Sequence, residues 1–190
     1  MWSTSNPQAS ATQWHRARAD KSPHVQPTHP AGLADLLKSA EAQGVDWVLI
    51  DTAAQTDSTA AEAIDAADVV LVTCRPSIVD LRAITNTIRL CRIRDVTPHV
   101  VLTQTEAHGT LQEEARRSLE AMRVDVLPQS LGRRAAFHHS MIDGRAATEY
   151  EPRGKAAQEA RELYRAICRI DGMTTRRRDD IPSTRAGSTA

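Results

Sequence analysis

An acidic residue at the end of a short apolar run is the feature of this sequence that points most directly to chemistry. Asp51 follows the run Trp47–Ile50. In open α/β sheets, ligands bind outside the carboxyl ends of the strands, and a carboxylate there can order Mg²⁺ and its waters beside nucleotide phosphates. An aspartate in this place also serves as a helix N-cap or a turn former. Asp51 is therefore a candidate magnesium site, with a structural role as the alternative.

Three further groups of residues follow apolar runs and share the same predicted edge. They are Thr73–Pro76, Thr103–Thr105 and Pro128. Because the carboxyl ends of parallel strands meet at one edge of a sheet, we expect these residues to surround any bound ligand.

The remaining chemically suggestive residues have structural readings that compete with functional ones. His138 and His139 are adjacent, but neighbouring helical residues point about 100° apart, so a surface pair is favoured over a metal pair. Arg133 and Arg134 fit either a phosphate or dimer contact or a solvated helix start. The three cysteines are far apart and lack C-x-x-C spacing, which favours buried reduced thiols: Cys74, Cys91 and Cys168.

The elements that would position these residues alternate between short apolar strands and amphipathic helices. The apolar runs predict strands at 46–51, 69–73, 100–102 and 124–127, with a short extended piece at 24–26. Helical spacing predicts helices at 8–18, 31–43, 58–67, 77–92, 110–122, 133–141 and 156–170. This alternation indicates an α/β fold, doubly wound, with a mostly parallel sheet flanked by helices on both faces.

Composition sets the outer limits of the prediction. The 24 basic and 24 acidic residues cancel, so a nucleic-acid contact would need a local patch. Arg176–Arg178 form such a run, but Asp179 and Asp180 follow at once and favour a solvated tail.

No stretch reaches the roughly 18 apolar residues of a membrane span, and the first residues lack a signal-peptide pattern, so we expect a cytoplasmic protein. Residues 1–170 are predicted to form one α/β domain and residues 171–190 a disordered tail.

Read in order, several segments resemble the ParA-type partition ATPases of the MinD/ParA deviant Walker A family. Asn6–Trp14 (NPQASATQW) is similar to the family's D-x-D-P-Q-x-S-A segment, and Trp47–Ala54 (WVLIDTAA) to its Walker B segment. Ala67–Leu81 matches the next strand and loop, and Val100–Thr105 with the stretch ending at Tyr164 resembles the C-terminal part of plasmid partition ATPases. The resemblance covers residues 6–170.

The resemblance implies a P-loop NTPase-like fold and a Mg²⁺-dependent ATPase that acts in plasmid or chromosome segregation. It implies that Asp51 orders Mg²⁺ through water, that Asn6 occupies the position of a water-positioning aspartate, and that Gln104 faces the adenine of ATP. It further implies a ParB-like centromere-binding partner, a homodimer or a dimer with a full-length relative, and non-specific DNA binding. Asn6 cannot accept a proton as a carboxylate does, so hydrolysis should suffer.

The phosphate-binding segment of the family is not found in this sequence. The family begins with a strand and a K-G-G-x-G-K-[ST] loop, which supplies backbone N–H groups and a lysine to the phosphates. Lys21, Lys38 and Lys155 lie in no comparable glycine-rich context. We therefore expect an N-terminally truncated member, deficient in ATP binding and hydrolysis, so its status as an enzyme stays open.

Losing that strand has a structural consequence and leaves two alternatives. The family's P-loop strand lies beside the Walker B strand, so its loss would leave the strand at 46–50 with an unpaired apolar edge. A nucleotide-free interaction module or pseudo-ATPase, pairing with a full-length relative or a ParB-like partner, is the first alternative. An unrelated doubly wound enzyme is the second, since fold does not fix function.

Overall fold

The computed structural model describes residues 1–4, 10–52, 57–106 and 110–170. The strands are β1 (Trp2–Thr4), β2 (Val25–Pro27), β3 (Leu49–Asp51), β4 (Val70–Cys74), β5 (Pro98–Thr105) and β6 (Asp125–Gly132). The helices are α1 (Ser10–Ala17), the 3-10 turn η1 (Pro30–Gly32), α2 (Leu33–Ala42), α3 (Asp57–Ala66), α4 (Ile78–Ala83), α5 (Thr85–Ile93), α6 (Leu111–Ala121), α7 (Ala135–Ile142), α8 (Ala147–Tyr150) and α9 (Lys155–Ile170). The predicted tail at 171–190 and the predicted position Asn6 lie outside the described residues.

All strand pairs are parallel, as predicted, but the described strands form two sheets. One has the order β2-β1-β3 and the other β4-β5-β6, with three strands in each. Within the described residues, β3 pairs only with β1 and β4 only with β5. The expected unpaired edge of the strand at 46–50 is therefore present, and a second open edge lies on β4.

The first residues of the chain form a strand that the sequence did not predict. Trp2, Ser3 and Thr4 pair with β2 on one side and β3 on the other. The backbone N–H of Leu49 donates to the carbonyl of Met1 at 3.0 Å, which fixes this register. A strand of three residues shows no measurable period in a sequence, so only its pairing on both sides defines it.

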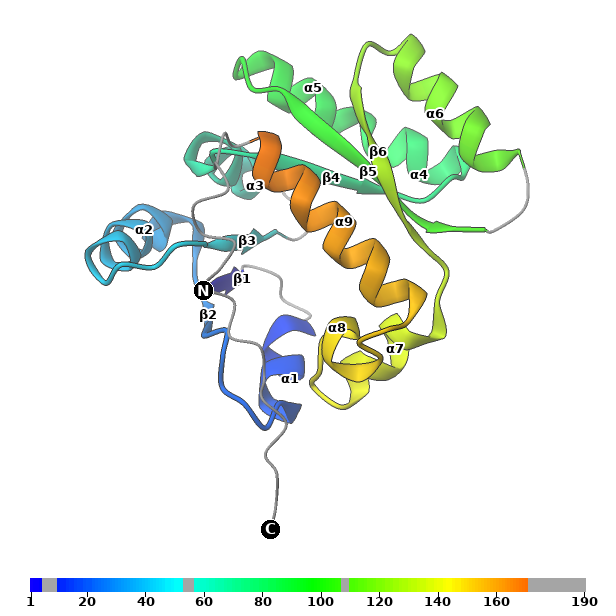
Figure 1. Cartoon of the computed structure of the whole chain (residues 1–190). Coiled ribbons are helices and arrows are strands. Elements are labelled where there is room, and N and C mark those ends of the chain that lie inside the picture. The colour runs from blue at the N-terminus through cyan, green and yellow to red at the C-terminus, as the bar shows by residue number, and fades with distance from the viewer. Residues whose placement is uncertain (5–9, 53–56, 107–109, 171–190) are drawn as a thin grey trace.

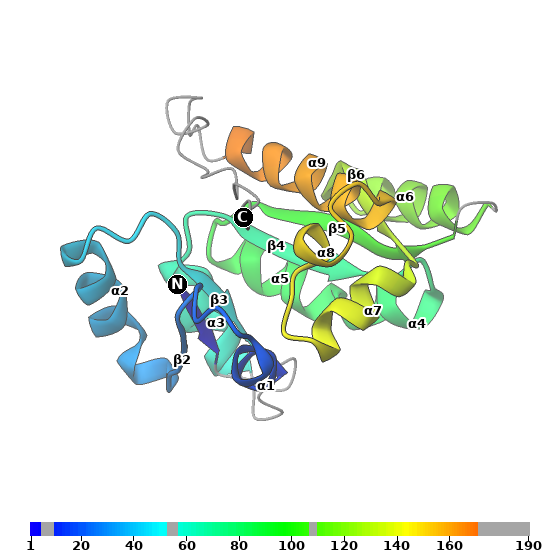
Figure 2. The same ribbon diagram turned by 60° about the horizontal axis from the view of Figure 1, so that its bottom comes forward.

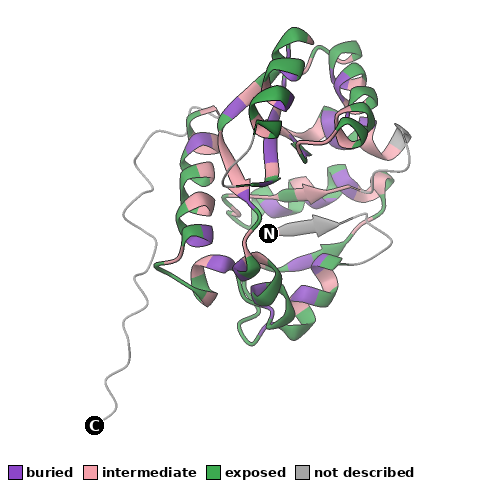
Figure 3. Ribbon diagram, turned by 90° about the vertical axis from the view of Figure 1, so that its right-hand side faces the viewer, coloured by how far each residue is buried: buried purple, intermediate pink, exposed green. Residues whose placement is uncertain are grey.

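The main hydrophobic core lies between one face of the β4-β5-β6 sheet and the helices α4, α5 and α6. Val100 and Leu102 of β5 are fully buried there with Ile88 of α5 and Leu119 of α6. Figure 3 shows this pattern as purple positions on the inner sides of helices whose outer sides are green. The apolar residues of the central strand β5 are buried as a parallel sheet requires, whereas β3 is only partly buried.

Two helices connect the two sheets, one on each face. Figures 1 and 2 place β3 between β1 and β4, with α9 covering one face and α3 the other. Helix α3 contacts α2 on one side and α5 on the other, while α9 contacts β6. The ring of Tyr164 in α9 lies 6.0 Å from that of Trp47, just before β3. The helix layers are therefore continuous where the pairing of the described strands is interrupted.

The predicted helix at 77–92 is divided at Ile84 into the two helices α4 and α5. The hydroxyl of Thr85 donates to the carbonyl of Leu81 at 3.1 Å, a local bond that bends helices. Ile84 has φ −76° and ψ −12° and separates α4 from α5. Ser77 is the N-cap of α4, since its hydroxyl accepts from the backbone N–H of Asp80 at 3.2 Å.

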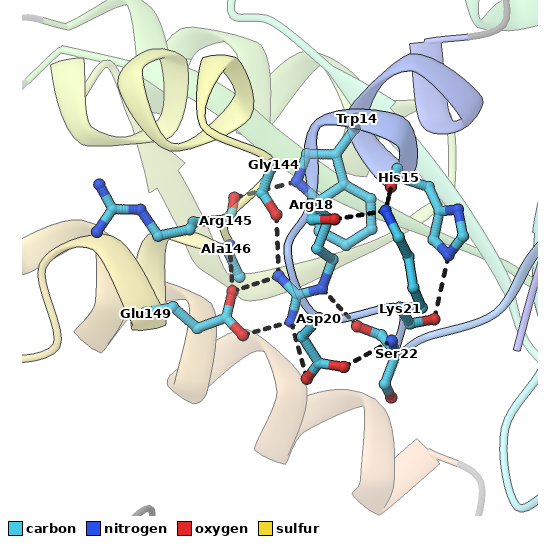
Figure 4. A network of polar contacts seen from close by, with 10 residues as sticks. All are labelled: Trp14, His15, Arg18, Asp20, Lys21, Ser22, Gly144, Arg145, Ala146 and Glu149. Carbon is cyan, nitrogen blue, oxygen red and sulfur yellow. Dashed lines mark hydrogen bonds and ion pairs between the residues drawn. The ribbon is translucent and has the colours of Figure 1, made fainter. Parts of the chain in front are cut away.

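A polar network anchors α1 to the loop between α7 and α8 (Figure 4). The buried guanidinium of Arg18 donates to Glu149 at 2.7 and 2.5 Å and to the carbonyl of Gly144 at 2.9 Å. The indole N–H of Trp14 donates to the carbonyl of Arg145 at 3.1 Å. Glu149 also accepts from the N–H of Ala146 at 2.7 Å, which organises the one-turn helix α8. Helix α8 is too short to have shown a period in the sequence.

Helix α6 ends at a non-glycine residue in the left-handed region, and this makes a stabilising substitution possible. Arg123 has φ 56°. A left-handed conformation costs an L-residue about 1–2 kcal/mol, so Arg123→Gly is expected to raise the free energy of unfolding by about 0.5–1 kcal/mol once chain entropy is counted. Chemical denaturation measures the change. The control is Arg117→Gly, an exposed position inside the same helix, which should lower the free energy of unfolding by about 1 kcal/mol. A loss of stability in both variants would contradict the prediction.

No helix in the described part of the chain is long and apolar enough to cross a membrane.

Candidate functional site

A cleft of about 470 Å³ opens at the carboxyl ends of β4, β5 and β6. It lies where ligands bind in open α/β sheets, as expected from the sequence. Most of its lining side chains are polar or charged, and an apolar minority lies among them. The lining residues are Arg75, Ser77, Asp80, Gln104, Glu106, Gln112 and Arg133, with Pro76, Val79 and Leu111.

One side of the cleft is fixed by the turn between β4 and α4. Arg75 donates to one carboxylate oxygen of Asp80 at 3.1 and 3.0 Å, and the hydroxyl of Ser77 donates to the other oxygen. The hydrogen bond from Ser77, followed by those from Arg75, lowers the pKa of Asp80 below its usual value. Asp80 is therefore a carboxylate at neutral pH and holds the charge of Arg75 in place.

Gln104 occupies an irregular position in β5 that directs it to the cleft. The register between β5 and β6 shifts between Thr103 and Thr105, so Gln104 is an extra residue in its strand. It has φ 52°, in the left-handed region, and its side chain is exposed. A bulge of this kind re-aims a side chain at the end of a strand, and such strained residues cluster at functional sites. The predicted cofactor-binding residue thus lines the cleft.

The opposite side is held by the end of β6 and by α9. The N–H of Arg133 donates to the carbonyl of Thr105 at 2.9 Å. Glu159 of α9 accepts from the N–H of Gly132 at 2.9 Å and from Arg134 at 3.1 and 2.7 Å. The sequence left the roles of the two arginines open. In the structure Arg134 is paired with Glu159, while Arg133 lines the cleft and is exposed.

Cys74 lies at the end of β4, next to this cleft, but its environment opposes nucleophilic chemistry. Its side chain is buried, and burial together with the charge of Asp80 raises the pKa of the thiol to about 11. Because the thiolate is the reactive form, Cys74 packs as a small apolar residue at neutral pH. Cys91 is also buried, and Cys168 is half-buried rather than buried as predicted; all three are free.

Asp51 lies at the carboxyl end of β3, in the other sheet. It is half-buried, and it does not line the cleft around Gln104. The described residues contain no group of three or more His, Cys, Asp or Glu side chains arranged to hold a metal ion, His138 and His139 included. The two predicted residues Asp51 and Gln104 therefore share the carboxyl edge of the fold without sharing one cavity.

The cleft fits a neutral heterocyclic base better than a triphosphate. Gln104 and Gln112 offer amide donors and acceptors, and Val79 and Leu111 offer apolar surface to a ring. Asp80 and Glu106 add two carboxylates, which repel phosphate, and the charge of Arg75 is already engaged by Asp80, so Arg133 is the remaining cation among the lining residues. In the described part of the chain no glycine-rich lysine loop presents N–H groups to phosphates. These residues therefore fit a nucleoside better than they fit a magnesium triphosphate.

Four lining residues were not singled out from the sequence, one of them Val79 in α4. Glu106 follows Thr105, while Leu111 and Gln112 begin α6. Gln112 donates to the hydroxyl of Ser130 in β6 at 3.4 Å, so its place depends on a residue 18 positions later. The start of a helix soon after a strand end was the available signal, because βα loops line ligand sites in such sheets.

Comparison with known proteins gives a consistent picture. A family model described as cellulose biosynthesis protein BcsQ matches residues 9–168. The maintenance of carboxysome distribution protein A of Halothiobacillus neapolitanus is 28% identical over 120 residues, which are 60% of this chain and 56% of that protein.

Two solved structures share the fold. The cell division ATPase MinD of Pyrococcus furiosus has a TM-score of 0.58 at 21% identity, covering 73% of this chain and 59% of that one. A ParA family ATPase from Chlorobium tepidum has a TM-score of 0.61 at 15% identity, covering 82% and 73%. The chain thus spans less than two thirds of the carboxysome protein and of this MinD, and its fold is that of MinD/ParA P-loop NTPases, as the sequence predicted.

Proposed function

The chain belongs to the family described as cellulose biosynthesis protein BcsQ, a relative of the ParA/MinD ATPases, and from this premise we propose that it is a ParA-like partition protein. In this proposal it takes part in plasmid or chromosome segregation together with a ParB-like partner. It recognises the base of an adenine nucleotide through the cleft around Gln104, and it is deficient in ATP hydrolysis.

The observation that carries the proposal is the placement of Gln104. An exposed amide with φ 52°, at a register shift between β5 and β6, lines a cavity of about 470 Å³ at the ligand-binding edge of a parallel sheet. Glutamine pairs with adenine through its amide, which can donate and accept at once. The apolar side chains of Val79 and Leu111 add contact area for a planar ring.

The proposed deficiency in hydrolysis follows from residue chemistry. ATP with Mg²⁺ supplies the transferable phosphoryl group when it is bound to the ATPases of this class. In this chain Asp51 is the proposed residue for ordering Mg²⁺ through water, and Asn6 stands where the resemblance implies a water-positioning aspartate. An amide cannot take the proton of an attacking water, so bound nucleotide should persist unhydrolysed.

Titration calorimetry with adenosine and with Mg-ATP tests the base site. We expect adenosine to bind with millimolar to high-micromolar affinity, because one amide and two apolar contacts supply only about 4–6 kcal/mol. Gln104→Ala should weaken adenosine binding about tenfold, the effect of losing roughly 1.4 kcal/mol of hydrogen bonding. Mg-ATP should bind no more tightly than adenosine.

Asp51→Ala is the matched control, since Asp51 lies outside the cleft and should leave adenosine affinity unchanged. Loss of adenosine binding in Asp51→Ala but not in Gln104→Ala would contradict the assignment of the base site. Tight binding of Mg-ATP with steady phosphate release would contradict the proposed deficiency.

A nucleotide-free interaction module is the second candidate, and one observation favours it. Ile78, Val79 and Leu111 are 70%, 76% and 56% exposed beside the cleft. Exposed apolar side chains grouped in this way mark protein contacts. The absence of any adenosine binding, with a ParB-like partner still bound, would decide for this candidate.

A further inference from the structure

The charged side chains that line the cleft at the carboxyl ends of β4, β5 and β6 differ in how far they are neutralised. They are two arginines and two carboxylates, Arg75, Arg133, Asp80 and Glu106. Arg75 donates to Asp80 at 3.1 and 3.0 Å, so these two charges offset each other. In the described part of the chain, the side chains of Arg133 and Glu106 make no hydrogen bond or ion pair. The cleft therefore offers a ligand one available cation and one available carboxylate.

Arg133 is directed to the cleft by its neighbours in the chain. Glu159 of α9 accepts from the N–H of Gly132 at 2.9 Å and from the guanidinium of Arg134 at 3.1 and 2.7 Å. Arg134 has φ −113° and ψ 132°, an extended conformation in which successive side chains point to opposite sides. Arg133 therefore points away from α9, and its N–H donates to the carbonyl of Thr105 at 2.9 Å. Main-chain contacts thus set its place, and its exposed guanidinium is available to a ligand.

The contacts for a base and for an anion belong to the same cavity. Thr105, which holds the backbone of Arg133, directly follows Gln104 in β5. A ligand whose base meets the amide of Gln104 therefore has the guanidinium of Arg133 on an adjoining wall. The cavity of about 470 Å³ is within the usual range of small-ligand sites, roughly 300–1,000 Å³. A planar guanidinium binds phosphate through two parallel N–H donors, so Arg133 fits a phosphate joined to that base.

The remaining charges of the cleft limit how many phosphates it favours. Glu106 follows Thr105, on the same wall, and its carboxylate repels negative charge. A second or third phosphate would add charge, and the described lining residues offer no further cation that is not already paired. The charges of the cleft therefore favour one phosphate over three.

We infer that the cleft selects a nucleoside monophosphate, which Gln104 binds at the base and Arg133 binds at the single phosphate. This inference rests on the proposed base site and adds to it a ligand class and a second binding residue. Arg133 supplies one charge-assisted contact, and Glu106 disfavours di- and triphosphates. AMP is the probe, and adenosine, ribose 5-phosphate and ATP without Mg²⁺ are the comparison ligands.

Nuclear magnetic resonance titrations of the isotope-labelled full chain give the Kd of each ligand from the side-chain signals of Gln104 and Arg133. AMP should bind about fivefold more tightly than adenosine, the effect of one charge-assisted contact at an exposed site. Ribose 5-phosphate should bind at least about tenfold more weakly than AMP, because it lacks the base. ATP should bind no more tightly than adenosine. The advantage of AMP should shrink as NaCl is raised from about 20 to about 300 mM, because salt screens exposed charges.

Three variants locate these effects. Arg133→Gln should lower the affinity for AMP to that for adenosine. Arg169→Gln is the matched control, since Arg169 is exposed in the last turn of α9 and does not line the cleft, and it should keep the fivefold advantage. Glu106→Gln keeps the size of the side chain and removes its charge, so it should tighten ATP binding about threefold. Circular dichroism establishes that each variant is folded.

The results that would overturn the inference separate it from the proposed base site. Equal Kd values for adenosine and AMP, or an advantage of AMP that survives in Arg133→Gln, would show that Arg133 does not bind the phosphate, while the base site would stand. Ribose 5-phosphate that binds as tightly as AMP, with no binding of adenosine, would mean that the base site itself fails. Tighter binding of ATP than of AMP would overturn the selection of a single phosphate.

Discussion

Gly144→Ala is expected to lower the free energy of unfolding by about 2–5 kcal/mol. Gly144 has φ 66°, where a side chain costs about 1–2 kcal/mol. An added Cβ would lie 2.3 Å from the backbone nitrogen of Arg18 and 2.6 Å from the carbonyl carbon of Ala17. Neither backbone atom can rotate away, so the loop and α1 must separate at an overpacking cost of about 1–3 kcal/mol. Urea denaturation followed by circular dichroism measures the loss.

Gly44→Ala is the matched control, because it isolates the backbone conformation from the close approach. Gly44 ends α2 with φ 69°, and a Cβ there would meet nothing within 4 Å. Gly44→Ala should lower the free energy of unfolding by about 1 kcal/mol, from the backbone conformation alone. Equal losses for the two variants would show that the contact between Gly144 and α1 contributes nothing.

The contrast between these two glycines shows what the sequence could and could not reveal. Gly44 directly follows the amphipathic helix predicted at 31–43, so a left-handed stop at this residue can be read from its neighbours. Gly144 also follows a predicted helix, at 133–141, but its close approach to the backbone of Arg18, which is 126 residues away, cannot be read from its neighbours. Local conformation is readable from neighbouring residues, whereas a close backbone approach between distant segments is not.

The helices and strands can be divided in the same way, into those that neighbouring residues define and those that distant segments define. The long periodic helices and the apolar strands were predicted because Ile88 and Leu119, and the residues around them, repeat with the period of the element that buries them. β1 was missed because its three residues are defined only by pairing with β2 and β3. The split into α4 and α5 was missed because the apolar spacing continues through Ile84, where the two helices meet.

The sequence predicted that the candidate site lies at the carboxyl edge of the sheet, but not which residues line its cavity. Gln104 was placed at the end of its strand from the pattern of apolar residues alone. The bulge that turns it toward the cleft arises from the pairing of β5 with β6, and Gln112 joins it only through the start of α6. Asp51 and Gln104 were expected around one ligand, and the interruption between β3 and β4 places them in different sheets.

Arg18→Met is expected to destabilise the protein by about 3 kcal/mol at neutral pH. Arg18 is 8% exposed and binds both oxygens of Glu149 and the carbonyls of Gly144 and Ser22. Its loss leaves these acceptors without their donor, and breaking a buried pair costs about 3–5 kcal/mol. The lower end applies because the side chain of Glu149 is 41% exposed and can be hydrated. Arg117→Met, which breaks an exposed pair with Glu113, should cost no more than about 0.5 kcal/mol.

The effect of Arg18→Met should also depend on pH, in a direction that the structure determines. The hydrogen bond from Arg18 lowers the pKa of Glu149 in the folded state. The stabilisation is therefore complete above the ordinary glutamate pKa of about 4.3 and is lost as the pH falls through the lower folded value. Urea denaturation at pH 7 and pH 3 should show that the difference in free energy of unfolding between wild type and Arg18→Met is smaller at pH 3. The difference should not vanish at pH 3, because the two carbonyls still accept from Arg18. An equal difference at both pH values would mean that Glu149 contributes no charge interaction.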